Sequence, residues 1–423
     1  MSEQHGLPRR IGIGGALLLA FNGAIGASIF ALPATLAADF GTSAPWLFPL
    51  VGIASLLIAI PFSRSVAAFP ESGGPATYGR VFGRLAGFEL GWIYYIARAT
   101  AFAANLNVLT SYFARWWTGA DGGAMRVGLM LALVAGFAAI NISGVRSAMR
   151  VLGGLTFLKT VPLLLVAGAA LLIAGIPTPG PLPPISDVEA GVLIVFYAFV
   201  GFENATVTAG ETKDPNRTLP RALLGTIGTV ALLYFFVQLA FVAVFPQGLE
   251  SGSDAPLLAL GDWLIGPVGA LLIGATAIFS TAGNLHSNMA ATPRVTFAMA
   301  ERGELPGWLA TVSRRFDTPV ASILFFAALV AALAVSGSFV WLAVVSTLAR
   351  MIIYSVTILA LPRAPERPAR ITPSHWTLAV VGVLICALVA AQADLTAWLT
   401  LAALSAAGLL LFFATVVRST SRT

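Results

Sequence analysis

Residues 22–30 read NGAIGASIF and interrupt a long apolar stretch that covers residues 11–38. Two glycines and two small polar residues stand there in place of the apolar side chains that a membrane helix needs. Residues 196–205 read FYAFVGFENA and carry a similar interruption, in which a glycine is followed by a carboxylate and an amide. Irregular backbone persists at membrane depth only where protein or a cavity satisfies its polar groups. The two stretches therefore predict two broken membrane helices beside a cavity.

The composition indicates a single transmembrane domain over residues 1–423. Only 10% of the 423 residues are charged, against about 25% in a soluble protein, and 58% are hydrophobic. These values exclude a disordered chain and argue against a water-soluble enzyme. The single cysteine, Cys386, excludes an internal disulfide framework, and three scattered histidines offer no metal cluster, so we expect neither a metal nor a cofactor. No basic patch lies on a soluble domain, so the net charge of +6 does not indicate a nucleic-acid partner.

Twelve stretches approach the length of about 20 apolar residues that a membrane helix needs. They cover residues 11–38, 44–64, 85–117, 124–143, 151–175, 188–210, 220–245, 266–290, 319–335, 338–361, 376–393 and 396–417. A proline-rich turn at 177–184 separates the fifth stretch from the sixth. We therefore expect an all-α membrane protein in which residues 1–176 and 185–362 form two five-helix halves, followed by two C-terminal helices in residues 363–423.

The basic residues are distributed asymmetrically over this arrangement. If the N-terminus is cytoplasmic, nineteen of the 24 lysines and arginines fall on the cytoplasmic side, and only Arg115 and Arg126 fall outside. Cytoplasmic loops of membrane proteins carry such an excess. An even number of crossings puts the C-terminus on the same side, so we expect a multi-pass protein of the inner (plasma) membrane with both termini cytoplasmic. The other three bases, Arg98, Lys159 and Arg350, lie at membrane depth.

The breaks carry a specific chemistry. A half-helix that begins near Ala27 and Ser28 directs free N–H groups and a positive dipole end at the cavity, which suits a carboxylate. Free carbonyls near Ala24, Tyr197 and Val200 suit an ammonium group. A carboxylate site next to an ammonium site describes an α-amino acid. The alternative is that these glycines only let helices pack closely, but two breaks in corresponding positions of two halves are typical of a transporter site.

Several motifs occur in order along nearly the whole chain. Residues 26–30, GASIF, are similar to a Gly-x-Gly-Ile-Phe break, with Ser28 in place of the second glycine. The other motifs are FPESGGP at 69–75, GFE at 201–203, GETKDPNR at 210–217, and Pro293-Arg294 followed by AMAERG at 298–303. With these motifs the sequence resembles the amino acid–polyamine–organocation (APC) superfamily of permeases, with its leucine-transporter-type fold.

The resemblance implies a five-plus-five inverted repeat with broken helices 1 and 6, two extra C-terminal helices and alternating access to a site at mid-membrane. It implies secondary active transport of amino acids by a protein that is not an enzyme. Tyr197 would form an aromatic lid, and the Ser28 hydroxyl would join backbone N–H groups at the substrate carboxylate. The implied substrate-binding residues are Ala24, Ile25, Gly26, Ala27, Ser28, Arg98, Tyr197, Val200, Gly201 and Phe202.

Two of the charges at membrane depth are candidates for proton coupling, because an ionisable residue there is costly. Lys159 resembles a lysine that replaces a sodium ion in some proton-coupled relatives, and burial disfavours the ammonium form of a lysine. The alternatives for Lys159 are a permanently charged structural tether or a sodium-dependent protein. Glu203 resembles a glutamate that helps to close and protonate the site, and its alternative is a buried acid that holds the break by a hydrogen bond to the first helix.

Arg98 and Arg350 leave two explanations open. Helix carbonyls hold the cations and Glu203 pairs with one of them, or Arg98 binds an anionic group of the substrate and favours acidic amino acids. The function that we expect is proton-coupled uptake of an amino acid, with an amino acid or amine exchanger as the alternative and a nontransporting receptor as a distant one. The expected partners are an amino acid, protons and the lipid bilayer, and both a monomer and a homodimer stay open.

Overall fold

Helices form the secondary structure throughout the described part of the chain. The computed structural model describes residues 11–69, 74–117, 122–143, 149–181, 185–249, 255–367 and 370–420. Within those ranges the extended structure is a single isolated bridge between Ile11 and Thr212. The all-α prediction is therefore confirmed for the described residues. Residues 70–73 of the second motif and residues 182–184 of the proline-rich turn lie outside them.

The first half of the chain supplies six of the longer helices and three short ones. These elements are α1 (Ile13–Ala24), α2 (Ser28–Phe40), η1 (Gly41–Trp46), α3 (Leu47–Ala67), α4 (Pro75–Gly79), η2 (Arg80–Phe82), α5 (Arg84–Ala114), α6 (Gly123–Ile142) and α7 (Met149–Ala174). Here η denotes a 3-10 helix.

The second half of the chain supplies the other elements. Its elements are α8 (Ile185–Phe199), η3 (Phe202–Glu211), α9 (Pro215–Val244), α10 (Pro256–Ile265), α11 (Pro267–Ala291), α12 (Pro293–Glu301), η4 (Gly307–Ala310), α13 (Val320–Ser336), α14 (Phe339–Ala360) and η5 (Leu361–Arg363), followed by α15 (Pro373–Ala391) and α16 (Leu395–Thr420).

Each of the twelve expected stretches contains a helix, and the first and sixth stretches are broken as predicted. Eight helical segments in the described residues are long and apolar enough to cross a membrane. The break in the first stretch separates α1 from α2, and the break in the sixth separates α8 from η3. Two details differ from expectation. The sixth stretch continues after its break as a 3-10 helix, and the short helix α10 lies in a connection where none was expected.

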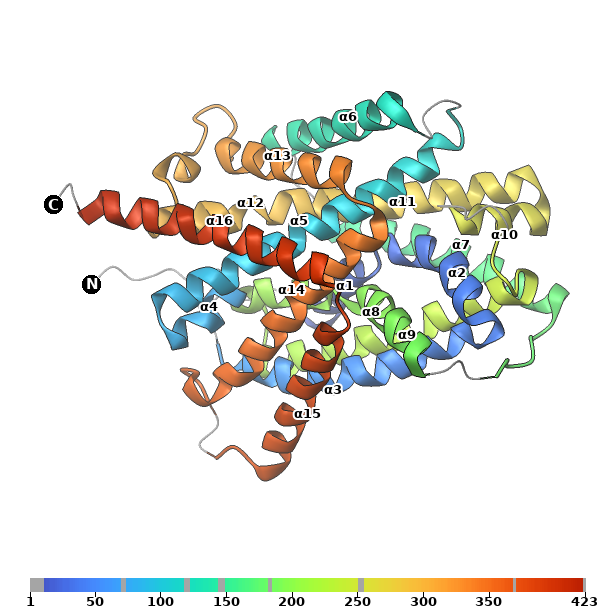
Figure 1. The fold of residues 1–423 in the computed structure, drawn as a ribbon, viewed down its shortest axis with the longest axis horizontal. Coiled ribbons are helices and arrows are strands. Elements are labelled where there is room, and N and C mark those ends of the chain that lie inside the picture. Colours follow the sequence, from blue (N-terminus) through green and yellow to red (C-terminus); the bar gives the residue numbers. More distant parts are fainter. Residues whose placement is uncertain are drawn as a thin grey trace.

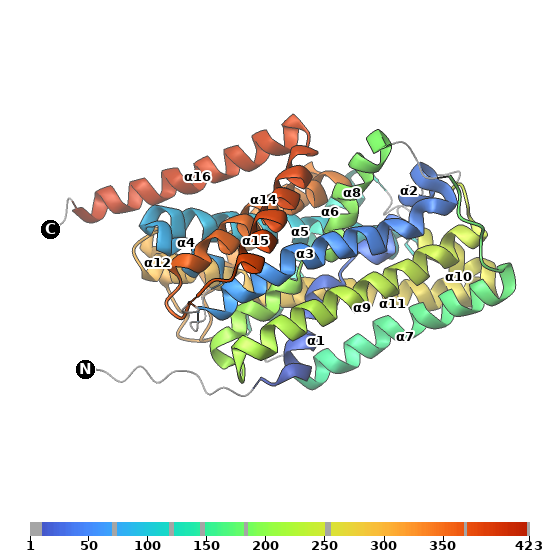
Figure 2. The same cartoon turned by 90° about the horizontal axis from the view of Figure 1, so that it is seen from below.

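The helix α5 lies at the centre of the arrangement in Figure 1, where it packs against α14, α11, α13 and α4. On the other side of the molecule α3 packs against α9 and α15. Figure 2 shows α7 and α16 at opposite margins, and their outward side chains are apolar and exposed, as at Leu172 and Leu410. The last turn of α16, α4 and α12 lie toward one end of the molecule, and α2 and α10 lie toward the other.

Candidate functional site

The two breaks lie against each other. The backbone of Gly201 has φ +104°, which strongly favours glycine. A Cβ atom added at Gly201 would lie 2.2 Å from the carbonyl oxygen of Gly23, and one added at Gly23 would lie 2.3 Å from the carbonyl oxygen of Gly201. Glycine is therefore required on both sides of this crossing, which brings the end of α1 against the start of η3.

The first break is a short extended segment between two helices. Ile25 leaves the helical conformation with φ −84° and ψ 91°, and α2 begins at Ser28. The carbonyl of Ala27 accepts the N–H groups of Phe30 and Ala31 at 3.0 and 3.1 Å. The first N–H groups of a helix have no partner within that helix. The start of α2 therefore offers donors, together with a positive dipole end, at this point of the bundle.

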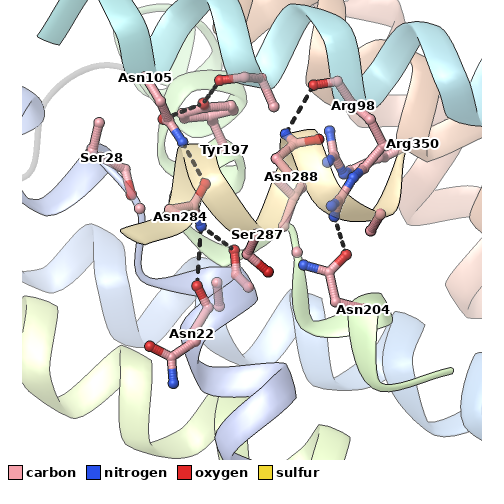
Figure 3. A pocket seen from close by; sticks show the side chains of 18 of the residues that line it. Asn22, Ser28, Arg98, Asn105, Tyr197, Asn204, Asn284, Ser287, Asn288 and Arg350 are labelled. Carbon is pink, nitrogen blue, oxygen red and sulfur yellow. Dashed lines mark hydrogen bonds between the residues drawn. The ribbon is translucent and has the colours of Figure 1, made fainter. Parts of the chain in front are cut away.

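A cavity of about 160 Å³ lies at the breaks. Eight of the ten predicted substrate-binding residues line it, and Figure 3 shows its polar side chains. These eight residues are Ala24, Gly26, Ala27, Ser28, Arg98, Tyr197, Val200 and Gly201. Two of the expected residues lie outside its lining. The side chain of Ile25 is fully buried, and Phe202 stacks on Tyr354 with ring centroids 5.3 Å apart.

Amide side chains dominate the rest of the lining, and sequence reasoning did not assign them to the site. They are Asn22, Asn105, Asn204, Asn284 and Asn288, with Ser287 beside them. The available signal was their position inside apolar stretches, where a polar side chain needs a partner. That signal does not separate a cavity-lining amide from one that bonds two helices together.

Two of these amides, Asn105 and Asn284, belong to a chain of hydrogen bonds across four helices, visible in Figure 3. The hydroxyl of Tyr197 donates to Oδ1 of Asn105 at 3.0 Å, and Nδ2 of Asn105 donates to Oδ1 of Asn284 at 2.8 Å. Nδ2 of Asn284 then donates to the carbonyl of Asn22 at 3.0 Å. The chain joins α8, α5, α11 and α1, so the carbonyl end of the first break is connected to the aromatic residue predicted as a lid.

Ser28 and Tyr197 each contact a further side chain beside the cavity. The Ser28 hydroxyl lies 3.1 Å from the hydroxyl of Tyr234 on α9. The Tyr197 ring meets Phe339 edge to face with centroids 5.7 Å apart. The Ser28 hydroxyl, expected at a substrate carboxylate, therefore already has a protein partner, and Tyr197 lines the cavity with its ring against Phe339.

Arg98 lines the cavity and is held there by neutral groups. Its Nη1 donates to Oδ1 of Asn204, and its Nε lies 3.3 Å from the hydroxyl of Thr292. The side chain is 6% exposed, and its guanidinium lies 6.0 Å from the centre of the Tyr94 ring. Among the described residues no carboxylate forms an ion pair with Arg98.

Arg350 has a different environment from Arg98. Its Nε donates to Oε1 of Glu203 at 2.7 Å, and its Nη1 donates to the carbonyl of Ala97 at 3.2 Å and to the Ser346 hydroxyl. The second carboxylate oxygen of Glu203 accepts the N–H of Gly201 at 2.7 Å and the Tyr354 hydroxyl at 2.8 Å. The expectation that Glu203 pairs with one cation and that carbonyls help to hold it is confirmed for Arg350. Glu203 bonds its own break rather than the first helix.

Lys159 reaches the first break from α7. Its Nζ donates to the carbonyl of Ile25 at 3.0 Å, and the residue is 2% exposed. The ring of Phe21 lies 5.9 Å from Nζ. No ion pair involving Lys159 is found in the described part of the chain. A buried ammonium group thus bonds a carbonyl of the unwound segment without a neighbouring carboxylate.

These features define a class of protein: a multi-pass membrane protein with a small polar cavity between two broken helices. The chain belongs to the amino acid permease family, whose model matches residues 11–393, and thereby to the APC superfamily. The expected family is confirmed.

Three relatives extend the comparison. An uncharacterised transporter of Mycobacterium tuberculosis is 30% identical over 398 residues, which are 91% of this chain and 86% of the relative. A serine/threonine exchanger of Bacillus subtilis is 30% identical over 78% of this chain and 77% of its own length. A branched-chain amino acid permease of Bacillus subtilis is 26% identical over 87% of this chain and 84% of its own length. All three are transporters by name, and none is named as an enzyme.

Proposed function

We propose that this protein takes up an amino acid by alternating access, coupled to protons, across the inner (plasma) membrane. The proposal includes twelve crossings, both termini in the cytoplasm, an inverted repeat of residues 1–176 and 185–362, and two further helices in residues 363–423. The observation that carries it is the cavity at two touching helix breaks. Unwound helices in corresponding positions of two halves are typical of secondary-transporter sites.

The cavity offers complementary groups for the two ends of an α-amino acid. The start of α2, at Ala27 and Ser28, offers N–H donors and a positive dipole end to the carboxylate. Ala24, Tyr197 and Val200 line the same cavity, close to the ends of α1 and α8. The last carbonyls of a helix have no partner within that helix, and in this proposal they accept from the ammonium group. The two ends of the substrate thus bind groups that are exposed only because the helices are broken. Glycine at position 26 lets the substrate approach the backbone closely.

Lys159 is the proposed proton-coupling residue. Its ammonium group is buried and bonds the Ile25 carbonyl, so it links α7 to the unwound segment of the first break. Burial disfavours the charged form of a lysine, and loss of the proton removes the positive charge that the carbonyl attracts. Deprotonation therefore loosens the contact between α7 and the break. Glu203 already pairs with Arg350 and holds Gly201, so we assign it to the maintenance of the second break as a carboxylate.

Arg98 is the proposed determinant of substrate choice. It lines the cavity with its guanidinium held by an amide and a hydroxyl, and the described residues provide it with no carboxylate. An uncompensated guanidinium in a small cavity favours a ligand with an anionic or strongly accepting side chain. The amides of Asn204 and Asn288 beside it suit the same kind of ligand.

Uptake into proteoliposomes tests the proposal. We expect accumulation of at least one radiolabelled L-amino acid from the twenty standard ones when the lumen is made alkaline relative to the outside. Lys159→Ala should abolish gradient-driven accumulation and retain counterflow exchange. Absence of accumulation under every imposed gradient contradicts proton coupling, and an unaffected Lys159→Ala variant identifies Lys159 as a structural tether.

Obligate exchange is the second candidate, and one observation favours it. The serine/threonine exchanger of Bacillus subtilis is 30% identical to this chain over 78% of its length. Exchange uses the same cavity and the same two breaks, but the empty carrier cannot return. Counterflow without net accumulation identifies this mechanism. Binding of an amino acid with neither counterflow nor uptake would instead identify a nontransporting receptor.

A further inference from the structure

A cavity of about 500 Å³ is lined entirely by ionisable residues, at the end of the molecule where Figure 2 shows α4 and α12. These residues are Arg80, Arg84, Arg302 and Glu304, and we call them the arginine cluster. Glu304 is buried, and its two carboxylate oxygens accept from Arg80 at 2.6 Å and from Arg302 at 3.0 Å. Three positive charges and one negative charge leave the cluster with a formal charge of +2.

Arg84, at the start of α5, is the guanidinium of the cluster that has no carboxylate partner among the described residues. Its Nη2 donates to the carbonyl of Gly303 at 3.2 Å, directly between Arg302 and Glu304 in the chain. A guanidinium carries five N–H donors in a planar fork that matches the oxygens of a phosphate. Because Arg84 is exposed and this bond uses one donor, its other donors remain available to a ligand in the cavity.

A contact with α16 gives the level of the arginine cluster in the membrane. The guanidinium of Arg84 lies 5.6 Å from the centre of the Phe412 ring, five residues before the end of the apolar span Leu395–Val417. At about 1.5 Å per residue, the contact lies roughly 7–8 Å inside the end of that span. This is the depth of the boundary between lipid headgroups and acyl chains. The adjacent apolar side chains of Leu85 and Phe413 are 44% and 51% exposed, so they face the lipid at the same level.

We propose that the arginine cluster binds an anionic phospholipid, with the phosphate held by Arg84 and the neighbouring guanidinium groups. An acyl chain then lies along Leu85 and Phe413. Basic pockets between membrane helices bind lipid headgroups in this way. The charge of +2 calls for an anion, and the exposed apolar surface beside it favours a lipid over a soluble phosphate compound. A zwitterionic lipid brings its own cation to the cluster and therefore binds less well.

A lipid in this position links elements that also meet beside the central cavity. Arg84 belongs to α5, and Arg302 directly follows α12. The same two elements are joined where Nε of Arg98, on α5, lies 3.3 Å from the hydroxyl of Thr292, the residue before α12. A phosphate between the guanidinium groups adds a second link at the membrane surface. Because a ligand that binds the folded state stabilises it, the lipid should raise the temperature of unfolding.

Thermal unfolding of the purified full-length protein in mixed micelles tests the proposal. We expect the Tm to rise with the mole fraction of dioleoylphosphatidylglycerol, whereas dioleoylphosphatidylcholine, with the same acyl chains, should have little effect. Inorganic phosphate and glycerol 3-phosphate at constant ionic strength should not raise the Tm. Equal shifts with the two lipids overturn the proposal. A shift with the soluble anions as large as that with phosphatidylglycerol identifies a site for soluble phosphates and overturns the lipid assignment.

Arg84→Gln assigns the effect to the arginine cluster, because it leaves both ion pairs of Glu304 in place. It should raise the mole fraction of phosphatidylglycerol that gives half of the full shift at least fivefold. Arg84→Lys should recover part of the loss, since it keeps the charge but not the planar fork. The matched control is Arg370→Gln, because Arg370 is an exposed arginine that lines a different cavity together with Glu366. That control should respond like the wild-type protein.

A wild-type response of Arg84→Gln, or an equal loss of response in Arg370→Gln, overturns the assignment to this cluster. If Arg84→Gln does not elute as a single species in gel filtration, Arg302→Gln replaces it, because Glu304 then keeps its pair with Arg80. These measurements do not involve transport. Loss of the lipid effect therefore leaves the proposed uptake standing, and absence of uptake leaves the lipid site standing.

Discussion

At the scale of single residues, two arginines near the same cavity have opposite electrostatic situations. Arg350 is 2% exposed and is paired with Glu203, whereas Arg98 contacts an amide and a hydroxyl. A buried ion pair that is fully hydrogen-bonded contributes little net stability, but removal of one partner leaves an uncompensated buried charge. The first arginine therefore matters for folding, and the second is available to a ligand.

Glu203→Ala should strongly destabilise the protein. It leaves the Arg350 guanidinium buried without a counter-ion, a change that typically costs about 3–5 kcal/mol. Thermal unfolding in detergent measures the effect as a lower Tm. The matched control is Arg80→Gln, because Arg302 also pairs with Glu304 at 3.0 Å and keeps that buried carboxylate compensated when Arg80 is removed. The double change Glu203→Gln with Arg350→Met should recover part of the loss. Equal Tm values for Glu203→Ala and Arg80→Gln would contradict this account.

Arg98→Ala should change which amino acids are transported rather than whether the protein folds. Two arginines line the cavity, and among the described residues Arg350 has a carboxylate partner whereas Arg98 has none. The substitution therefore removes the cation that is available to a substrate. Competition by the twenty standard amino acids against labelled uptake measures the rank order. The half-inhibitory concentrations of amino acids with acidic and amide side chains should rise at least tenfold relative to those of the others. Arg294→Ala, at an exposed position at the start of α12, is the control. An unchanged rank order would assign Arg98 to structure.

At the scale of elements, the contact of the two breaks depends on backbone rather than on side chains. The carbonyl of Gly23 faces the Cα of Gly201 so closely that a Cβ atom cannot fit between them. Small residues at helix contacts allow this kind of close approach in membranes. The asparagine chain through Asn105 and Asn284 then fixes the rotation of α5 and α11 about the crossing.

Gly201→Ala should abolish uptake and lower the Tm. The added methyl group meets the Gly23 backbone at 2.2 Å, and alanine rarely adopts φ +104°. The matched control is Gly228→Ala on α9, where an added Cβ atom meets nothing within 4 Å. That control should retain uptake, because alanine is the better helix former. Wild-type transport by Gly201→Ala would show that the backbones of Gly23 and Gly201 can move apart without loss of function.

At the scale of the whole molecule, the proposed orientation in the membrane rests on the asymmetry of the basic residues and is open to a labelling test. In a Cys386→Ala background, Arg315→Cys lies in the connection before α13 and Gln247→Cys in the connection before α10, both at exposed positions. We expect an impermeant maleimide to label Gln247→Cys in intact cells and Arg315→Cys only after permeabilisation. The reverse pattern would overturn the cytoplasmic assignment of the termini.

The sequence by itself determined the helical class, the position of each long helix and the two breaks. These features are local, because the length of an apolar run and the presence of glycines and polar residues within it do not depend on distant parts of the chain. The family motifs can be recognised from the sequence for the same reason, since each is a short continuous stretch. The sequence also identified eight of the residues that line the central cavity. Seven of them belong to the breaks themselves, and Arg98 is recognisable as a charge in an apolar helix.

Only the tertiary structure decided which polar groups meet. The partners Glu203 and Arg350 are 147 positions apart, and Lys159 and Ile25 are 134 apart. Such pairs depend on how each helix is rotated and how deeply it lies in the bundle, and apolar runs without a strong periodicity leave that rotation undetermined. For this reason the amides of the cavity and the partner of the Ser28 hydroxyl emerged only when the helices were packed together.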